Sequence, residues 1–226
     1  MTAPRRVLLL IGSGKPSRST SEALGTYLCG RLRDRGWDAE ALRIAEAVRT
    51  EEGTEALLAA ADRADLVVLA FPLFADSLPY PATKAMERLA LRRPGRGGGR
   101  APRLLAIGNS GFPEAGQNDT ALAICRVFAR AAGFAWAGGL ALGGGASIDG
   151  VPLPEAGGRA RHAIRALDLA AEALAQDREV PPEAVETMAR PFVPARLYTW
   201  MGTAGWRSRA RALGTSKRLR DRPYAE

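Results

Sequence analysis

The chain has 226 residues, a formal net charge of +8 and two cysteines. This length suffices for one α/β domain with a full core and an additional segment. No apolar stretch approaches the ~20 residues that span a bilayer, and the short apolar run at residues 7–11 ends in glycine rather than in a signal-peptide cleavage site, so we expect neither a membrane-spanning nor a secreted protein.

The positive charge is concentrated at the end of the chain. Residues 190–226 contain nine arginines and lysines against two acidic residues, which leaves a net charge of only +1 for residues 1–189. The basic isoelectric point therefore does not describe the main body. Cys29 and Cys125 match no metal-binding spacing, and we expect reduced thiols, no metal site and a cytoplasmic location.

Strand and helix patterns alternate along most of the chain. The expected strands are residues 7–11, 38–44, 66–71, 103–109 and 135–142, and the expected helices are residues 21–35, 55–63, 82–91, 118–133 and 159–176. The fourth helix has five apolar residues that we expect to face the core: Leu122, Cys125, Val127, Phe128 and Ala132. The sequence RPGRGGGR at residues 93–100 indicates a surface loop.

This alternation predicts an α/β fold with a doubly wound, five-stranded parallel sheet of the flavodoxin-like order 2-1-3-4-5 and helices on both faces. We expect a domain over residues 1–180 and a basic, aromatic-containing C-terminal extension over residues 181–226. Ligands of such sheets bind at the carboxyl ends of the strands, at the switch point between strands one and three. The loops after strands one, three and four are therefore the candidate binding loops.

The first candidate loop is GSGKPSRSTS, residues 12–21. It is not a Walker loop, because Pro16 follows Gly14-Lys15, and it lacks the third glycine of a dinucleotide fingerprint. Hydroxyl residues remain at an expected helix start, where backbone N–H groups and the helix dipole favour a phosphate. The alternative is a helix N-cap with additional serines.

The second candidate loop is FPLFADSLPYPATK, residues 71–84. Its three prolines stiffen the backbone, and Leu73, Phe74 and Leu78 form an expected apolar ledge for one face of a flat aromatic ligand. The alternative is a loop that buries its own side chains.

The third candidate loop is NSGFPEAGQND, residues 109–119. Its amide, hydroxyl and backbone N–H groups suit the polar edge of a ring, and the alternative is a plain strand-to-helix turn. A phosphate loop, an apolar ledge and a polar edge, placed in this order along one sheet, together describe a flavin mononucleotide (FMN).

The same three loops resemble the cofactor loops of flavodoxin-like NAD(P)H-dependent FMN reductases, over roughly residues 5–177. Gly14 and Lys15 stand where that family often has an arginine, and the iron–sulfur cysteine cluster of a related branch is absent. By this resemblance, the phosphate is bound by Ser13, Ser19, Thr20 and Ser21, the isoalloxazine lies beside Pro72, Leu73, Phe74, Asp76 and Ser77, and its polar edge meets Asn109, Ser110, Gly111 and Phe112.

The resemblance implies an FMN-dependent oxidoreductase that takes hydride from NADPH or NADH and reduces a small acceptor such as a flavin or a quinone, as a homodimer. Such an enzyme needs no catalytic side chain, because the flavin carries out the hydride chemistry. His162, the one histidine, is expected to be a surface or packing residue. Two alternatives remain: an electron carrier that binds FMN without oxidising NAD(P)H, and a fold relative with a vacant site that acts through its tail.

The C-terminal extension combines aromatic and basic residues. Tyr198, Trp200 and Trp206 precede an arginine cluster. We rank three roles for this extension. A packed extension with a solvated basic end is preferred, docking near the flavin or across a second subunit comes second, and a contact with an anionic membrane or nucleic acid comes third.

Overall fold

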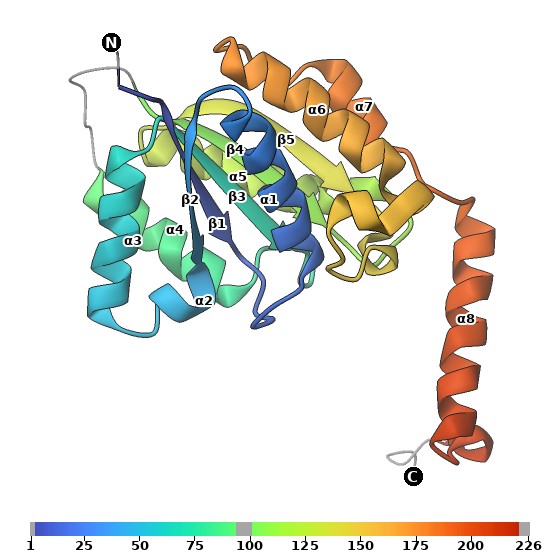
Figure 1. Ribbon diagram of the computed structural model, residues 1–226. Coiled ribbons are helices and arrows are strands. Elements are labelled where there is room, and N and C mark those ends of the chain that lie inside the picture. Colours follow the sequence, from blue (N-terminus) through green and yellow to red (C-terminus); the bar gives the residue numbers. More distant parts are fainter. Residues whose placement is uncertain (1–2, 94–100, 222–226) are drawn as a thin grey trace. The chain divides into compact units, whose positions relative to one another are not determined.

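The computed structural model describes residues 3–93 and 101–221, so residues 94–100 of the expected surface loop lie outside the described residues. Its five strands are all parallel and lie in the order β2-β1-β3-β4-β5 (Figure 1). Their bounds are β1 Arg6–Ile11, β2 Asp38–Arg43, β3 Leu66–Pro72, β4 Arg103–Asn109 and β5 Ala135–Leu142. The predicted doubly wound sheet is therefore confirmed.

Helices cover both faces of this sheet (Figure 1). One face carries α1 (Thr20–Arg33), α6 (Arg161–Ala175) and α7 (Pro182–Ala189). The other carries α2 (Ile44–Ala47), α3 (Glu51–Arg63), α4 (Tyr80–Arg92) and α5 (Asp119–Ala131). Short 3₁₀ segments lie at Ala115–Asn118, Gly145–Ser147 and Leu153–Ala160.

The interior strand β1 explains why both faces need helices. Val7, Leu9 and Ile11 belong to the core under α1 and α6, whereas Leu8 and Leu10 belong to the core under α3 and α4. Such an uninterrupted apolar run is typical of a strand that is buried on both faces. Gly25 allows α1 to lie close to β1, since a Cβ there would come within 2.3 Å of Leu9 Cδ1.

The chain forms two compact units, residues 1–192 and residues 193–226. The helix α7, which follows residue 180, packs in the first unit, where Ala184 and Met188 are buried against the sheet core. The second unit contains α8 (Ala195–Ala212) and a 3₁₀ turn at Ser216–Arg218. Across the described residues, no helix is long and apolar enough to cross a membrane.

The structure corrects the expected inward face of α5. Val127 is 70% exposed, whereas Cys125 and Phe128 are buried as expected. Successive residues of a helix are about 100° apart, so Val127 lies roughly 200° away from Cys125 and points to solvent. Val127 is adjacent in sequence to the buried Phe128, but the helical period places it on another face of α5.

Candidate functional site

A cavity of about 620 Å³ lies at the carboxyl ends of β1, β3, β4 and β5. Ten of the thirteen site residues expected from the sequence line this cavity: Ser13, Ser19, Thr20, Ser21, Pro72, Leu73, Phe74, Asn109, Ser110 and Gly111. The other three, Asp76, Ser77 and Phe112, do not line it. Six further residues line it that the sequence analysis did not select: Gly14, Lys15, Pro16, Gly145, Ala146 and Asp149.

Two serines of the first loop keep a hydroxyl proton that they can donate. Ser19 is the N-cap of α1, and its Oγ accepts a hydrogen bond from the backbone N–H of Glu22 at 3.1 Å. Ser13 Oγ accepts from the N–H of Lys15 at 3.2 Å. Because a hydroxyl has one proton as well as its acceptor lone pairs, both side chains can still donate to an anion. The capping role and an anion-binding role are therefore compatible at Ser19.

Thr20 and Ser21 are held more firmly by the protein itself. Thr20 Oγ1 donates to the carbonyl oxygen of Gly145 at 2.9 Å, so this hydroxyl proton is not available to an anion while the bond is formed. Ser21 Oγ accepts a hydrogen bond from Asn109 Nδ2 at 2.8 Å. The backbone N–H groups of both residues belong to the first turn of α1, which offers no acceptor within the helix and carries the positive end of the helix dipole.

Asn109 joins three of the loops around the cavity. Its Nδ2 donates to Ser21 Oγ at the start of α1 and to the carbonyl oxygen of Phe71 at 2.9 Å, near the end of β3. The backbone of Asn109 also pairs with the second loop, through the N–H of Leu73 at 2.8 Å. The side chain is 6% exposed, so these hydrogen bonds form in a nearly dry environment. The third loop is therefore tied to the first and the second by one amide.

The second loop forms a tight turn from Phe74 to Ser77. The backbones of these two residues exchange hydrogen bonds of 2.9 and 3.0 Å, and both residues between them, Ala75 and Asp76, have positive φ, as in a type I′ turn. Asp76 therefore lies at the tip of the turn. Leu78 is buried in the core, so the expected ledge consists of Pro72, Leu73 and Phe74, of which Phe74 is 59% exposed.

A fourth loop, after β5, closes the cavity. The N–H of Gly145 donates to the carbonyl oxygen of Ser110 at 2.8 Å, and Asp149 pairs with Lys15 at 3.6 Å. Gly150 has a φ of +72°, and a Cβ at this position would lie 1.9 Å from the carbonyl oxygen of Arg18. This loop is not among the three candidate loops expected from the sequence, although the glycine run at residues 143–145, directly after a strand, is a signal for it.

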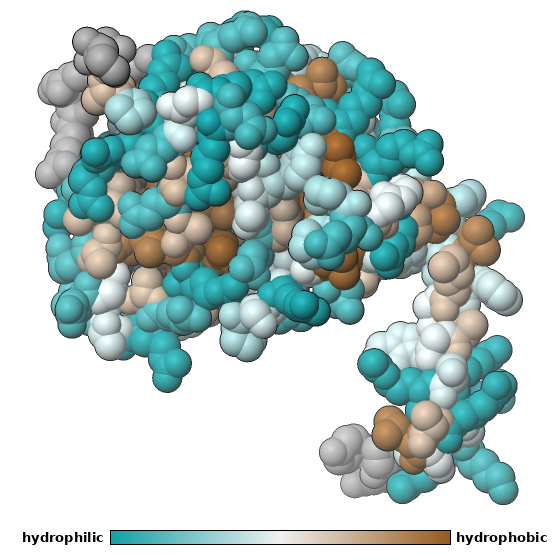
Figure 2. All heavy atoms as spheres, in the orientation of Figure 1, coloured by the Kyte–Doolittle hydropathy of each residue, from teal (hydrophilic) through white to brown (hydrophobic). Residues whose placement is uncertain are grey.

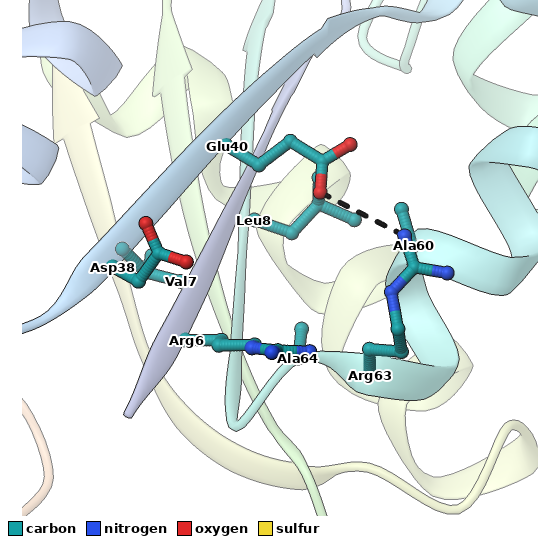
Figure 3. Close-up of a pocket in the computed structure, with 8 residues that line it drawn as sticks. All are labelled: Arg6, Val7, Leu8, Asp38, Glu40, Ala60, Arg63 and Ala64. Atoms are coloured by element: carbon teal, nitrogen blue, oxygen red, sulfur yellow. Dashed lines mark ion pairs between the residues drawn. The ribbon is translucent and has the colours of Figure 1, made fainter. Parts of the chain in front are cut away.

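Two other cavities differ from this one. A groove of about 550 Å³ is lined by Ser17, Arg18, the first turns of α1 and residues 150–155. A cavity of about 80 Å³ lies between β1, β2 and α3. Arg63 pairs with Glu40 there at 3.9 Å, and Figure 3 shows this ion pair. The smaller cavity holds little more than water, because ligand pockets of proteins measure roughly 300–1,000 Å³.

The large cavity offers different chemistry at its two ends. One end has hydroxyl groups, the N–H groups of a helix start and the Lys15 ammonium, whereas the other has Pro72, Leu73 and Phe74. Ser110 and Asn109 supply polar groups between them. Such a site suits an elongated ligand with an anionic group at one end and a flat apolar group at the other.

Solved structures share this architecture. A flavodoxin from Streptococcus pneumonia TIGR4 covers 76% of this chain with 99% of its own length, at a TM-score of 0.53 and 17% identity. The fold is flavodoxin-like. An FMN-dependent NADH-azoreductase from Bacillus anthracis str. Ames Ancestor, solved in complex with FMN, covers 76% of this flavodoxin-like chain with 99% of its own, at a TM-score of 0.54 and 14% identity.

A flavone reductase covers the same share of the chain with 63% of its own length, at a TM-score of 0.58 and 14% identity. No protein-family model matches the sequence, and no curated protein matches it. At these identities the solved structures establish the flavodoxin-like fold, and the chemistry has to be argued from the site.

Proposed function

We propose that this flavodoxin-like protein is an FMN-dependent oxidoreductase that accepts hydride from NADPH or NADH and passes the electrons to a small acceptor. The observation that carries the proposal is the cavity at the carboxyl edge of the sheet, whose donor end and apolar end match the two ends of FMN. Structures of a flavodoxin and of an FMN-dependent azoreductase share the fold and support it.

The donor end fits a terminal phosphate. The protons of Ser13 and Ser19 and the N–H groups of Thr20 and Ser21 would meet its oxygens, while Lys15 adds a positive charge. Gly14 leaves open space at the cavity, because no atom lies within 4 Å of a Cβ added there. These groups can bind a phosphate without a metal ion, which suits a phosphate that is held in place and not transferred.

The apolar end fits the isoalloxazine ring. Pro72, Leu73 and Phe74 would pack against one face of the ring, and the N–H of Gly111 and the hydroxyl of Ser110 would border its polar edge. When bound, FMN supplies the hydride chemistry itself. The chain would hold the ring in place and keep water from the face that it covers.

The same proposal includes a nicotinamide donor and a small acceptor. It also includes a homodimer and a cytoplasmic location. The cytoplasmic location is supported by the two free cysteines, which are both buried. Phe74 is the exposed aromatic at the cavity mouth and would be the first side chain that an incoming substrate meets.

The test is an anaerobic absorption measurement on the purified protein, with riboflavin as the matched ligand for FMN. The proposal predicts that FMN binds much more tightly than riboflavin and that NADPH or NADH bleaches the flavin bands with steady-state turnover. Binding of FMN without reduction by either nucleotide would instead indicate an electron carrier. Failure to bind FMN would contradict the proposal.

A further inference from the structure

The second unit, residues 193–226, carries the charge that distinguishes the two parts of the chain. Its 18-residue helix α8 contains four arginines and no acidic residue. Within the described part of this unit, Arg196, Arg207, Arg209 and Arg211 form no ion pair. Of the basic residues that follow there, Lys217, Arg218 and Arg220, only Arg218 is paired, with Asp221 at 3.0 Å. An unneutralised cluster of this kind attracts an anionic surface.

Large apolar side chains are exposed on the same helix. Trp200 is 68% and Trp206 is 71% exposed, and within the described part of α8 only Ala210 is buried. Further exposed apolar residues of this unit are Leu197, Met201, Leu213 and Leu219. Figure 2 shows hydrophobic and hydrophilic residues next to one another on this helix. An apolar surface of this extent, beside free cations, indicates a partner that is both apolar and anionic.

The helical period places the two kinds of residue together. Leu197, Trp200 and Met201 are three and four residues apart and share one side of α8, and Arg207 and Arg211 follow Trp200 on that side after two and three turns. A hollow of about 300 Å³ lies beside Trp206 and Arg209, where Gly202 and Gly205 have no side chains. Indole and guanidinium groups are thus adjacent at Trp206 and Arg209, which line the same hollow.

From this arrangement we propose that α8 binds an anionic phospholipid surface and lies in its interfacial plane. Tryptophan and leucine side chains enter the boundary between headgroups and acyl chains, and the arginines contact the lipid phosphates. The helix does not cross the bilayer. This inference is independent of the proposed function, because it concerns the second unit alone.

Two other partners fit α8 less well. A second copy of α8 would bring four more arginines against the first four, without any acidic residue to neutralise them. Nucleic acid would satisfy the arginines through its phosphates, but it would leave the exposed Leu197 and Met201 without an apolar partner. Both partners are outcomes that the experiment distinguishes.

The experiment is co-sedimentation of the full chain with vesicles of phosphatidylglycerol and phosphatidylcholine, compared with phosphatidylcholine alone. We expect binding to the anionic vesicles only, weakened by added salt. Replacing Arg207, Arg209 and Arg211 by Gln should weaken binding by about 100-fold, since each basic residue near such a surface contributes about fivefold. Trp200→Ala with Trp206→Ala should weaken it by at least about tenfold.

Matched controls remove the same groups from the first unit. The variant Arg49→Gln, Arg126→Gln and Arg130→Gln loses the same charge from exposed arginines, and Leu91→Ala with Val127→Ala removes exposed apolar side chains. Both controls should bind anionic vesicles like the unmodified chain. The proposal is overturned if the full chain does not bind anionic vesicles at low salt, or if test and control variants weaken this binding equally. It is also overturned if duplex DNA or single-stranded RNA is bound in preference to the vesicles. A change in subunit mass by light scattering as the sole effect of the α8 variants would overturn it as well.

Discussion

The side-chain amide of Asn109 donates to Ser21 Oγ at 2.8 Å, and this hydrogen bond joins the end of β4 to the start of α1 across 88 residues of sequence. The same nitrogen donates to the carbonyl oxygen of Phe71. The two ends of the proposed FMN site, one at α1 and the other after β3, are therefore held in register by one buried side chain.

Asn109→Ala should destabilise the protein before any ligand is added. The variant leaves the buried Phe71 carbonyl without this donor, and an unsatisfied buried group costs about 1–3 kcal/mol. Chemical denaturation of the ligand-free protein measures the loss, and FMN affinity should fall with it. Gln117→Ala, which removes an exposed amide from the same loop, is the control and should change neither quantity. An Asn109→Ala protein as stable as its parent would show that this amide does not organise the site.

Ser13→Ala should weaken FMN selectively over riboflavin. A hydrogen bond to a charged group contributes about 1.5–3 kcal/mol, which corresponds to roughly 10–100-fold in the dissociation constant of FMN. Ser17→Ala is the matched control, because Ser17 is exposed and lines the neighbouring groove instead. If Ser13→Ala weakened both ligands equally, the phosphate would have to lie elsewhere.

Thr20→Val should behave differently from Ser13→Ala. The Thr20 hydroxyl donates to the Gly145 carbonyl, so its removal loosens the contact between the first and fourth loops. We expect a loss of about 1–3 kcal/mol in the free energy of unfolding and a weakening of FMN and riboflavin by the same factor. Titration with both ligands separates the two cases, and a selective loss of FMN affinity would instead make this hydroxyl a direct phosphate donor.

Phe74→Ala should affect the ligand and leave the fold intact. Phe74 is largely exposed at the cavity mouth, and exposed substitutions change stability by only about 0.5 kcal/mol or less. A lost aromatic contact of about 0.5–1.5 kcal/mol should weaken both flavins by up to about tenfold. Phe112→Ala is the control, because Phe112 is equally exposed but does not line the cavity. Equal effects of the two variants would remove Phe74 from the site.

The two buried thiols should make the protein less stable in alkali. Burial raises the pKa of both Cys29 and Cys125 from an ordinary value of 9.0 to about 12. As the pH rises above 9, the unfolded chain loses these protons while the folded chain keeps them, so the free energy of unfolding falls until the pH passes about 12.

Denaturation at a series of pH values measures this slope. A variant with Cys29→Ala and Cys125→Ala should show a smaller decline between pH 8 and 10, since it lacks the titrating thiols. An identical decline in both proteins would assign the alkaline instability to other groups.

The sheet could be predicted from the sequence because four of its strands are short apolar runs bounded by turn signals, while the edge strand β2 alternates polar and apolar residues. The helices α7 and α8 were not predicted, since residues 181–226 lack the long apolar stripe that marks a core-facing helix. Val127 was misplaced because its apolar character was allowed to outweigh the helical period.

The candidate site was predictable as far as loop position determines it. The carboxyl edge of a parallel sheet collects its loops, and ten of the expected residues therefore line one cavity. The hydrogen-bond partner of each hydroxyl was not predictable. The carbonyl that accepts from Thr20, for example, is 125 residues away in the sequence. The turn that carries Asp76 away from the cavity depends on positive φ at two residues that are not glycine, which residue type does not indicate.

We propose that FMN binds at the carboxyl edge with its phosphate at the start of α1. An NMR titration of the isotope-labelled protein with FMN, followed at the backbone amides, tests this placement. The largest shifts should fall on residues 13–16, 19–21, 72–74 and 109–111 and on Gly145, Ala146 and Asp149, and riboflavin should reproduce them except at residues 13–16 and 19–21. Shifts confined to the groove at Arg18, Tyr27 and Leu153, or no shifts with FMN at all, would contradict it.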